Sequence, residues 1–175
     1  NLGLKLHLDG ARLFHALVET GDKPEDYGKV FDSISICLSK GLGAPIGSLL
    51  LGNKSFITDS RRIRKVMGGG MRQAGFIAAA GIFALDHNID RLKTDHNHAK
   101  QIAACLENLD YVGEVKPVKT NIIIFDLKEP WTSTAFLSKL AEKGVKASAF
   151  GPATIRFVTH LDISTEMIVK VLEVL

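Results

Sequence analysis

The first forty residues alternate between strand-like and helix-like patterns, and this alternation limits the folds open to the chain. Leu4, Leu6 and Leu8 alternate with polar residues, as in a half-buried strand, and the following ARLFHALVET has helical spacing. SISICLS is then a near-continuous apolar run, which is typical of a strand covered on both faces. Strand, helix and strand in this order predict a βαβ unit with two parallel strands.

The rest of the chain continues this α/β pattern. We predict a short strand at 47–52, helices at 56–67 and 73–85, and a long helix that starts near residue 89 and links two lobes. Strand and helix then alternate at 121–127, 132–144, 154–160 and 164–175. The first of these helices has a cap at Thr132 or Ser133 and a stop at Gly144, and STEMIVKVLEVL is also a capped helix. The sequence therefore predicts two domains, residues 1–86 with a mostly parallel sheet and residues 87–175 as a smaller α/β lobe.

Composition excludes several classes of protein. Lys and Arg (22) exceed Asp and Glu (19) by only 3, which is too small an excess to predict a nucleic-acid partner. No apolar segment approaches the roughly 18 residues of a membrane span, so we expect no membrane insertion. The only cysteines, Cys37 and Cys105, are expected to be buried free thiols in a reducing, cytoplasmic protein.

Two charged side chains follow the predicted parallel strands. Asp9 and Lys40 each come just after a strand, and ligands of open α/β sheets bind beyond the carboxyl ends of the strands. If the two strands are neighbours, about 4.8 Å apart, an acidic and a basic group flank the same crevice. Plainer interpretations remain open, because Lys40 can be a solvated surface lysine and Asp9 can serve the turn at Gly10.

The glycines after Lys40 do not form a nucleotide-binding loop. GLGAPIG has one residue too many before its third glycine and places Pro45 where a helix should open, and GNKS does not have the spacing of a P-loop. A lysine followed by glycines, opposite a carboxylate, instead suits a Schiff base with pyridoxal phosphate (PLP). In such a site the carboxylate keeps the pyridine nitrogen protonated, so that the ring withdraws electrons from a substrate carbanion.

Four motifs carry a resemblance to a known family. HLDGARLFHA, CLSKGLGAPIGSLL, RKVMGGGMRQAG and IRFVTHLDIS together resemble the low-specificity L-threonine aldolases, which are PLP enzymes of the aspartate-aminotransferase fold. The resemblance implies that residues 1–86 end a PLP-binding large domain and that 87–175 form its small domain. It also implies that the chain begins partway through a larger protein, with the phosphate loop and a histidine stacked on the ring lying before Asn1.

The resemblance assigns roles to several residues. It implies that Lys40 forms the Schiff base, that Asp9 faces the pyridine nitrogen and that Arg12 reaches both the cofactor and the substrate carboxylate. Arg156 would complete the carboxylate clamp, for which the planar fork of arginine is suited. Lys65 and Arg72 flank GGG and would approach the cofactor phosphate of a neighbouring subunit; the alternative for them is a basic helix face. For Arg156 the alternative is a surface position on a strand.

The histidines are not expected to bind metal. His96 and His98 lie two residues apart on a predicted helix and so face different directions. His160 and Asp162 follow a strand, and we expect them to form hydrogen bonds in a turn. No metal site is predicted.

By resemblance, the complete protein would cleave a β-hydroxy-α-amino acid such as L-threonine or L-allo-threonine to glycine and an aldehyde. It would be a cytoplasmic homodimer or homotetramer with shared active sites, and its general base is not identified. One alternative is a β-eliminating lyase or aminotransferase of the same fold. A second alternative is a domain that kept the fold as a structural or binding remnant without the cofactor.

Overall fold

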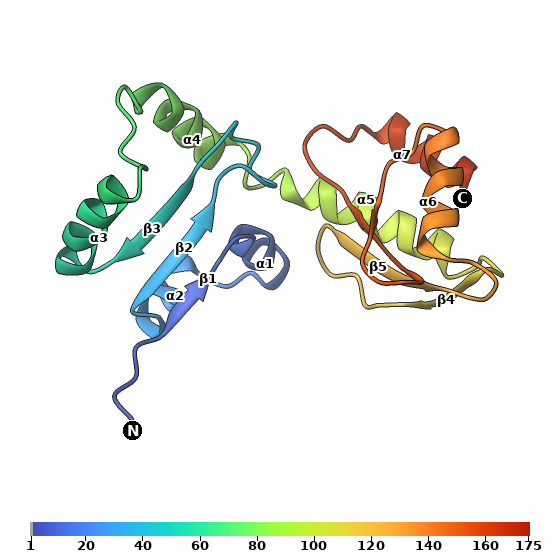
Figure 1. Cartoon of the computed structure of the whole chain (residues 1–175), viewed down its shortest axis with the longest axis horizontal. Helices are drawn as coiled ribbons and strands as arrows, with labels where there is room; N and C mark the ends of the chain where they lie inside the picture. The colour runs from blue at the N-terminus through green and yellow to red at the C-terminus, as the bar shows by residue number, and fades with distance from the viewer. Residues whose placement is uncertain (1) are drawn as a thin grey trace. The chain divides into compact units, whose positions relative to one another are not determined.

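The computed structural model describes residues 2–175, and the chain divides after Arg91 into two compact units. Unit 1 comprises the residues up to Arg91, and unit 2 comprises Leu92–Leu175. The division falls in the segment between two helices, five residues beyond the predicted boundary. Each unit has its own sheet and its own helices, so each is described by itself (Figure 1).

Unit 1 contains three strands and four helices. They are β1 (His7–Asp9), α1 (Leu13–Thr20), α2 (Pro24–Val30), β2 (Ser33–Cys37), β3 (Ser48–Gly52), α3 (Lys54–Val66) and α4 (Gly75–His87). The predicted helix after the first strand and the two predicted helices after the third strand are confirmed as α1, α3 and α4. Helix α2 is not among the predicted elements, because a glycine and a proline at Gly21 and Pro24 are typical of the end of a helix. Pro24 in fact opens the new helix, a position that proline tolerates because the first N–H groups of a helix have no partner within it.

The sheet of unit 1 has the order β1-β2-β3. Strands β1 and β2 are parallel, as predicted from the βαβ pattern, with Asp9 aligned to Ser35. Strand β3 runs antiparallel to β2, with Cys37 aligned to Ser48, and Figure 1 shows its arrow reversed. The connection from β2 to β3 contains no helix, and a short connection of this kind joins antiparallel neighbours more readily than parallel ones. The sheet of this unit is therefore mixed.

Helix α1 supplies the apolar contacts on one face of this sheet. Leu13 and Leu17 of α1 pack with Ile34 and Ile36 of β2, and all four are buried. The intervening residues of β2 are only partly buried, so the strand alternates instead of being covered equally on both faces. Cys37 is one of these, and both cysteines are free but partly exposed, which corrects the expectation that the thiols are buried.

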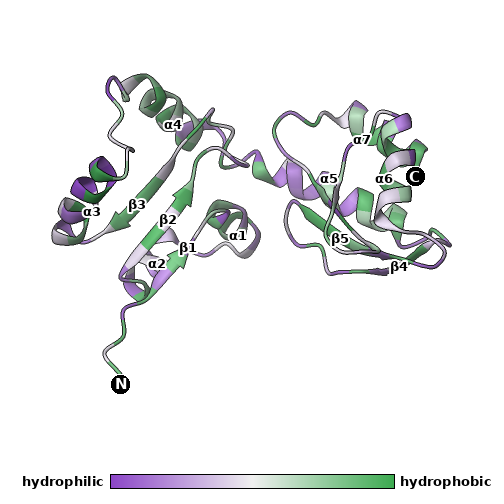
Figure 2. Cartoon of the chain, in the orientation of Figure 1, coloured by the Kyte–Doolittle hydropathy of each residue, from purple (hydrophilic) through white to green (hydrophobic). Residues whose placement is uncertain are grey.

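Strand β3 and helices α3 and α4 of unit 1 leave much apolar surface exposed. All five residues of β3 are exposed, and α3, which is capped by Asn53, has no buried residue. In α4 only Gly81 and Ala84 are buried, while Phe76 is 88% exposed. Figure 2 shows the hydrophobic colouring of β3 and α4. Within the described residues, these elements contribute little to a core of their own.

Unit 2 is built on an antiparallel sheet with three helices. Its elements are α5 (Leu92–Leu106), β4 (Val112–Val115), β5 (Ile122–Leu127), α6 (Ser133–Glu142), β6 (Ser148–Ala149), β7 (Thr154–Val158) and α7 (Thr165–Val174), with strand order β4-β5-β7-β6. Strands β5 and β7 and all three helices match the prediction, whereas the short edge strands β4 and β6 were not predicted. Too few residues of β4 and β6 alternate for a sequence pattern to reveal them.

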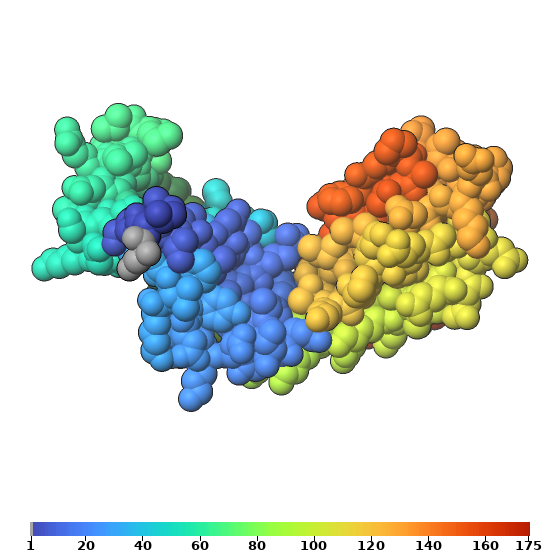
Figure 3. All heavy atoms as spheres, turned by 90° about the horizontal axis from the view of Figure 1, so that it is seen from below, coloured from blue at the N-terminus to red at the C-terminus, as the bar shows by residue number. Residues whose placement is uncertain are grey.

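One face of this sheet carries a continuous core. Alternate residues of β5 and β7, including Ile123, Phe125 and Ile155, are buried against α5, α6 and α7. Phe125 meets Phe136 of α6 and Phe157 of β7 edge-on, with ring centroids 5.9 and 5.4 Å apart. In the space-filling view the atoms of unit 2, yellow to red, form one unbroken body (Figure 3). The opposite face of the sheet carries the remaining side chains of the two strands.

Helix ends in unit 2 follow the predicted caps. The hydroxyl of Thr132 accepts the N–H of Ala135, and that of Ser164 accepts the N–H of Met167. Gly144 has a φ of 78°, the left-handed conformation that commonly ends a helix, so it stops α6 as predicted. Among the described residues, no helix combines the length and apolar character needed to cross a membrane.

Candidate functional site

Asp9 ends strand β1, and a glycine after it allows the strand to finish close to its neighbour. The N–H of Gly10 donates to the carbonyl of Ser35 at 2.8 Å, and a Cβ on Gly10 would lie only 2.8 Å from that same oxygen. Asp9 is exposed, and its Oδ1 accepts the N–H of Ala11 at 3.2 Å. The turn role that the sequence left open for Asp9 is therefore real, and the single bond orients the carboxylate at the end of the strand.

Arg12 stands three residues further, at the start of α1. The residue is half-buried, and its Nε is a buried atom without a hydrogen-bond partner among residues 2–175. A buried guanidinium N–H without an acceptor is energetically costly, so such an atom is a candidate for contact with an anionic ligand. Arg12 therefore fits a group that supplies oxygen acceptors at this edge of the sheet.

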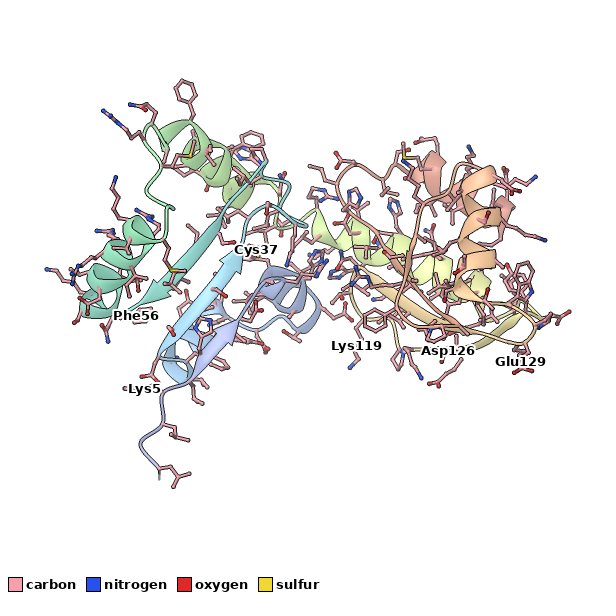
Figure 4. All side chains as sticks on the ribbon, in the orientation of Figure 1. Lys5, Cys37, Phe56, Lys119, Asp126 and Glu129 are labelled. Atoms are coloured by element: carbon pink, nitrogen blue, oxygen red, sulfur yellow. The ribbon has the colours of Figure 1, made fainter. Side chains whose placement is uncertain are left out.

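Lys40 is exposed and lies three residues beyond the end of β2. Cys37, labelled in Figure 4, marks the end of that strand, where the segment with Lys40 begins. Because β1 and β2 are parallel, Asp9 at the end of β1 and Lys40 beyond the end of β2 both lie at the carboxyl ends of neighbouring strands. The structure thus brings Asp9, Arg12 and Lys40 to the same edge of one sheet.

Close packing against His15 of α1 explains why the residue after Lys40 is a glycine, Gly41. A Cβ at this position would lie 2.1 Å from Nε2 of His15, a buried side chain of α1. No larger residue fits there without a shift of the imidazole. The glycine is thus required by packing against α1, and the backbone directly after Lys40 is held against that helix.

Lys65 lies in the last turn of α3 and Arg72 in the connection between α3 and α4, and both are exposed. The three glycines between them close the end of α3: the N–H of Gly69 donates to the carbonyl of Arg64 at 2.8 Å, and a Cβ on Gly70 would lie 2.5 Å from Cδ of Lys65. The glycines therefore form the break between α3 and α4. The role of the two cations in binding a phosphate stays a prediction.

Arg156 belongs to unit 2, where it lies on β7 between buried Ile155 and Phe157. Its side chain is therefore on the face of the sheet away from the helices. Its Nε is buried without a hydrogen-bond partner in the described part of the chain, and its guanidinium carbon lies 5.8 Å from the ring centroid of Phe150. Phe150 was not singled out in the sequence, because an aromatic residue in a turn gives no signal of its own.

An ion pair lies at the other end of the first sheet. There, Lys5 Nζ lies 2.8 Å from Asp32 Oδ1, and this hydrogen bond lowers the pKa of Asp32 and raises that of Lys5. Both side chains are exposed, which is typical of a surface ion pair of small energetic weight. A hollow beside it is lined by Asp32, Ile34 and Asn53, and it lies at the amino end of β2, away from Asp9 and Lys40.

The histidines lie in structural positions. His96 and His98 are buried in α5, and Nε2 of His98 lies 3.4 Å from the hydroxyl of Thr165. His160 and Asp162 contact each other at 3.3 Å in the turn after β7, as expected. Among residues 2–175, no group of three or more His, Cys, Asp or Glu residues is placed to hold a metal ion.

A comparison with protein families decides the affiliation of the chain. The model of the family described as beta-eliminating lyase matches residues 1–130, which include Asp9, Arg12 and Lys40. The chain belongs to the beta-eliminating lyase family.

Relatives in this family include threonine aldolases. The low specificity L-threonine aldolase of Escherichia coli (strain K12) is 43% identical over 169 residues, which cover 96% of this chain and 49% of the relative. Low-specificity L-threonine aldolase 1 of Arabidopsis thaliana is 41% identical over 166 residues, 93% of this chain and 46% of the relative. These similarities confirm the resemblance inferred from the four motifs. The chain spans about half the length of these relatives.

Solved structures show the same fold. A threonine aldolase from Leishmania major superposes with a TM-score of 0.75 at 22% identity, covering 98% of this chain and 51% of that chain. An ornithine delta-aminotransferase from Plasmodium falciparum superposes with a TM-score of 0.66 at 15% identity, covering 98% of this chain and 45% of that one. The predicted fold class, the α/β fold of PLP-dependent transferases, is confirmed.

Proposed function

We propose that this chain carries the lysine-bearing part of a PLP-dependent carbon–carbon lyase that cleaves L-threonine or L-allo-threonine to glycine and an aldehyde. The observation that supports it most is the placement of Asp9 and Lys40 at the carboxyl ends of two paired parallel strands. The family match and the threonine aldolase relatives give this arrangement its chemical meaning.

The residues present fit the cofactor. Lys40 is exposed at the edge of the sheet and would bind the aldehyde carbon of PLP, while the Asp9 carboxylate would face the pyridine nitrogen. Arg12, Lys65 and Arg72 would supply cationic donors to the cofactor. PLP, when bound, supplies an electron sink for the carbanion that forms as the α–β carbon bond breaks.

Two arginines are proposed to hold the substrate. The unpartnered buried Nε atoms of Arg12 and Arg156 are donors that a substrate carboxylate would satisfy. Since the guanidinium group stays charged at any working pH, carboxylate binding by these residues needs no titration on the protein side. In the overall reaction the β-hydroxyl loses a proton and the α-carbon gains one, and no residue of this chain is assigned to either transfer.

We also propose a cellular compartment and an oligomeric state for the protein. The exposure of Lys65 and Arg72 is in keeping with a homodimer or homotetramer in which they complete a neighbouring subunit's site. Two free cysteines suit the reducing cytoplasm. The partner in catalysis is a small amino acid, with no role proposed for nucleic acid or membrane.

Borohydride trapping tests the cofactor assignment. This chain, and a version extended upstream, are mixed with PLP, reduced and mapped for the labelled peptide. We expect the label on Lys40 and its loss in Lys40→Ala, with an unchanged unfolding midpoint because Lys40 is exposed at a strand end. Lys119→Ala, which removes a lysine of unit 2, is the matched control and should keep the label. Full labelling of Lys40→Ala would refute the assignment.

Product analysis separates the alternatives. Glycine and an aldehyde released from threonine by the extended version would support retro-aldol cleavage. Ammonia and a keto acid would instead indicate the β-eliminating activity for which the family is named. A keto acid without free ammonia would indicate transamination, in which the amino group passes to the cofactor. Because the chain spans about half of its relatives, a domain that binds no cofactor is the second alternative, and absence of label in both versions would favour it.

A further inference from the structure

The segment that carries Lys40 is a loop that its own backbone hydrogen bonds close at its ends. We call residues 38–47, between β2 and β3, the lysine loop. The N–H of Leu38 donates to the carbonyl of Gly47 at 2.9 Å, and the N–H of Ala44 donates back to the carbonyl of Leu38 at 3.0 Å. The N–H of Gly43 donates to the carbonyl of Lys40 at 2.9 Å. These bonds close the loop but involve neither of the two carbonyls that follow Lys40.

Two side chains from a distant segment bind those two carbonyls. Asn88 Nδ2 donates to the carbonyl of Leu42 at 2.7 Å, and Arg91 Nη1 donates to the carbonyl of Gly41 at 3.2 Å. The donors stand 46 and 50 residues further along the chain, in the connection between α4 and α5. Both lie within unit 1, so the connection is anchored on the peptides directly after Lys40.

The anchored peptides are buried. Gly41 is buried against His15, and Leu42 is 3% exposed. The two hydrogen bonds are part-buried, so water has limited access to a carbonyl that loses its donor, and leaving such a carbonyl without a partner is costly. The Asn88 and Arg91 bonds thus help to determine whether this part of the loop keeps its conformation.

We infer that Asn88 and Arg91 are positioning residues for Lys40, an inference that rests on the proposed function for its catalytic meaning. A lysine side chain has several rotatable bonds, so the direction of its backbone attachment limits where its amine can be held. Side chains that fix the two peptides after Lys40 fix that attachment. They act through the loop and touch neither cofactor nor substrate.

Hydrogen–deuterium exchange of this chain tests the anchoring without any cofactor. We expect Asn88→Ala to raise the exchange rate of the Gly43 and Ala44 amides about tenfold, since one hydrogen bond to a buried carbonyl is lost. Arg91→Ala should act on the same amides, and Arg91→Lys, which keeps a cationic donor, should act less. Asn108→Ala is the matched control, because its amide also donates to a carbonyl at 2.7 Å but in α5, and it should leave the loop unchanged. Unchanged loop exchange in both alanine variants would overturn the inference.

Competitive labelling tests the link to Lys40. In the version that takes the cofactor, the PLP label on Lys40 after borohydride is compared with the label on Lys29, an exposed lysine of α2. Asn88→Ala should lower the Lys40 to Lys29 ratio several-fold, and Arg91→Lys should restore part of the loss seen in Arg91→Ala. The urea midpoint of each variant is measured beside the ratio, because general destabilisation would also lower the specific label on Lys40. A ratio that is unchanged, or that falls only in proportion to a lowered midpoint, would overturn the positioning role. If the unsubstituted protein takes no label, the proposed function fails, and the exchange data alone decide whether the two side chains hold the loop.

Discussion

The two units differ in how completely their own residues cover their apolar side chains. Unit 2 buries fourteen residues in one cluster, which draws on strands β4, β5 and β7, on all three helices and on the segment after α6. In unit 1 the cluster on β2 contains four buried residues, while Leu49, Leu50 and Leu51 of β3 are 38%, 41% and 43% exposed. Apolar surface on this scale is unusual for a free-standing domain. The comparison indicates that unit 2 holds its fold by itself, whereas unit 1 depends on further contacts.

Separating the units should give the largest effect. Residues 92–175 alone are expected to unfold cooperatively in urea, because the whole cluster around Phe125 and Ile155 lies within them. Residues 1–91 alone are expected to show a broad transition or none. Circular dichroism and amide dispersion of the two pieces, beside the whole chain, measure this. A sharp transition of 1–91 matching that of the whole chain would break the comparison.

Two alanine substitutions, one in each unit, test the comparison at single residues. Phe125→Ala removes a fully buried ring that packs edge-on against two others, and it should lower the free energy of unfolding of unit 2 by about 3–5 kcal/mol. Leu50→Ala in β3 should cost about 1 kcal/mol or less, since the side chain is largely exposed already. Urea unfolding of both variants checks the difference. Equal losses would mean that β3 is covered in solution.

Gly41→Ala probes the tightest contact of the lysine loop. A Cβ 2.1 Å from the imidazole of His15 should destabilise unit 1 by about 1–3 kcal/mol through overpacking. Gly28→Ala is the control, because that glycine lies inside α2 with no atom within 4 Å of a new Cβ and should be neutral or stabilising by up to about 1 kcal/mol. Amide exchange of α1 and the loop reports the effect. If Gly41→Ala leaves the free energy of unfolding unchanged, the His15 imidazole moves away from the new Cβ without an energetic cost.

The smallest effect concerns the ion pair at the amino end of the first sheet. The hydrogen bond from Lys5 lowers the pKa of Asp32, so this stabilisation is present above the carboxyl's unfolded pKa and is lost as pH falls through the folded one. The raised pKa of Lys5 sets the other limit, since the pair weakens as pH rises through it. Lys5→Ala should return the Asp32 pKa toward 3.8, measured by NMR titration, with a small stability change that high salt removes. If the pKa of Asp32 in Lys5→Ala equals that in the unsubstituted protein, the hydrogen bond from the N–H of Leu6 is what lowers this pKa.

Local signals in the sequence predicted much of unit 2 because the determining contacts are close along the chain. Caps at Thr132 and Ser164 act over three residues, and the alternation in β5 follows directly from burial of one face. The edge strands β4 and β6 escaped prediction, since their pairing depends on neighbours rather than on their own pattern. The left-handed backbone of Gln73, with a φ of 51°, likewise has no sequence signal.

By itself, the sequence determined the βαβ start, the placement of Asp9 and Lys40 after strands, and the family motifs, because each of these is a short pattern with a local physical cause. Only the tertiary structure decided that β3 runs antiparallel, that Gly41 must be a glycine, and that Asn88 and Arg91 bind the loop after Lys40. Those features depend on groups that are distant along the chain and meet only when it folds, so no local pattern records them.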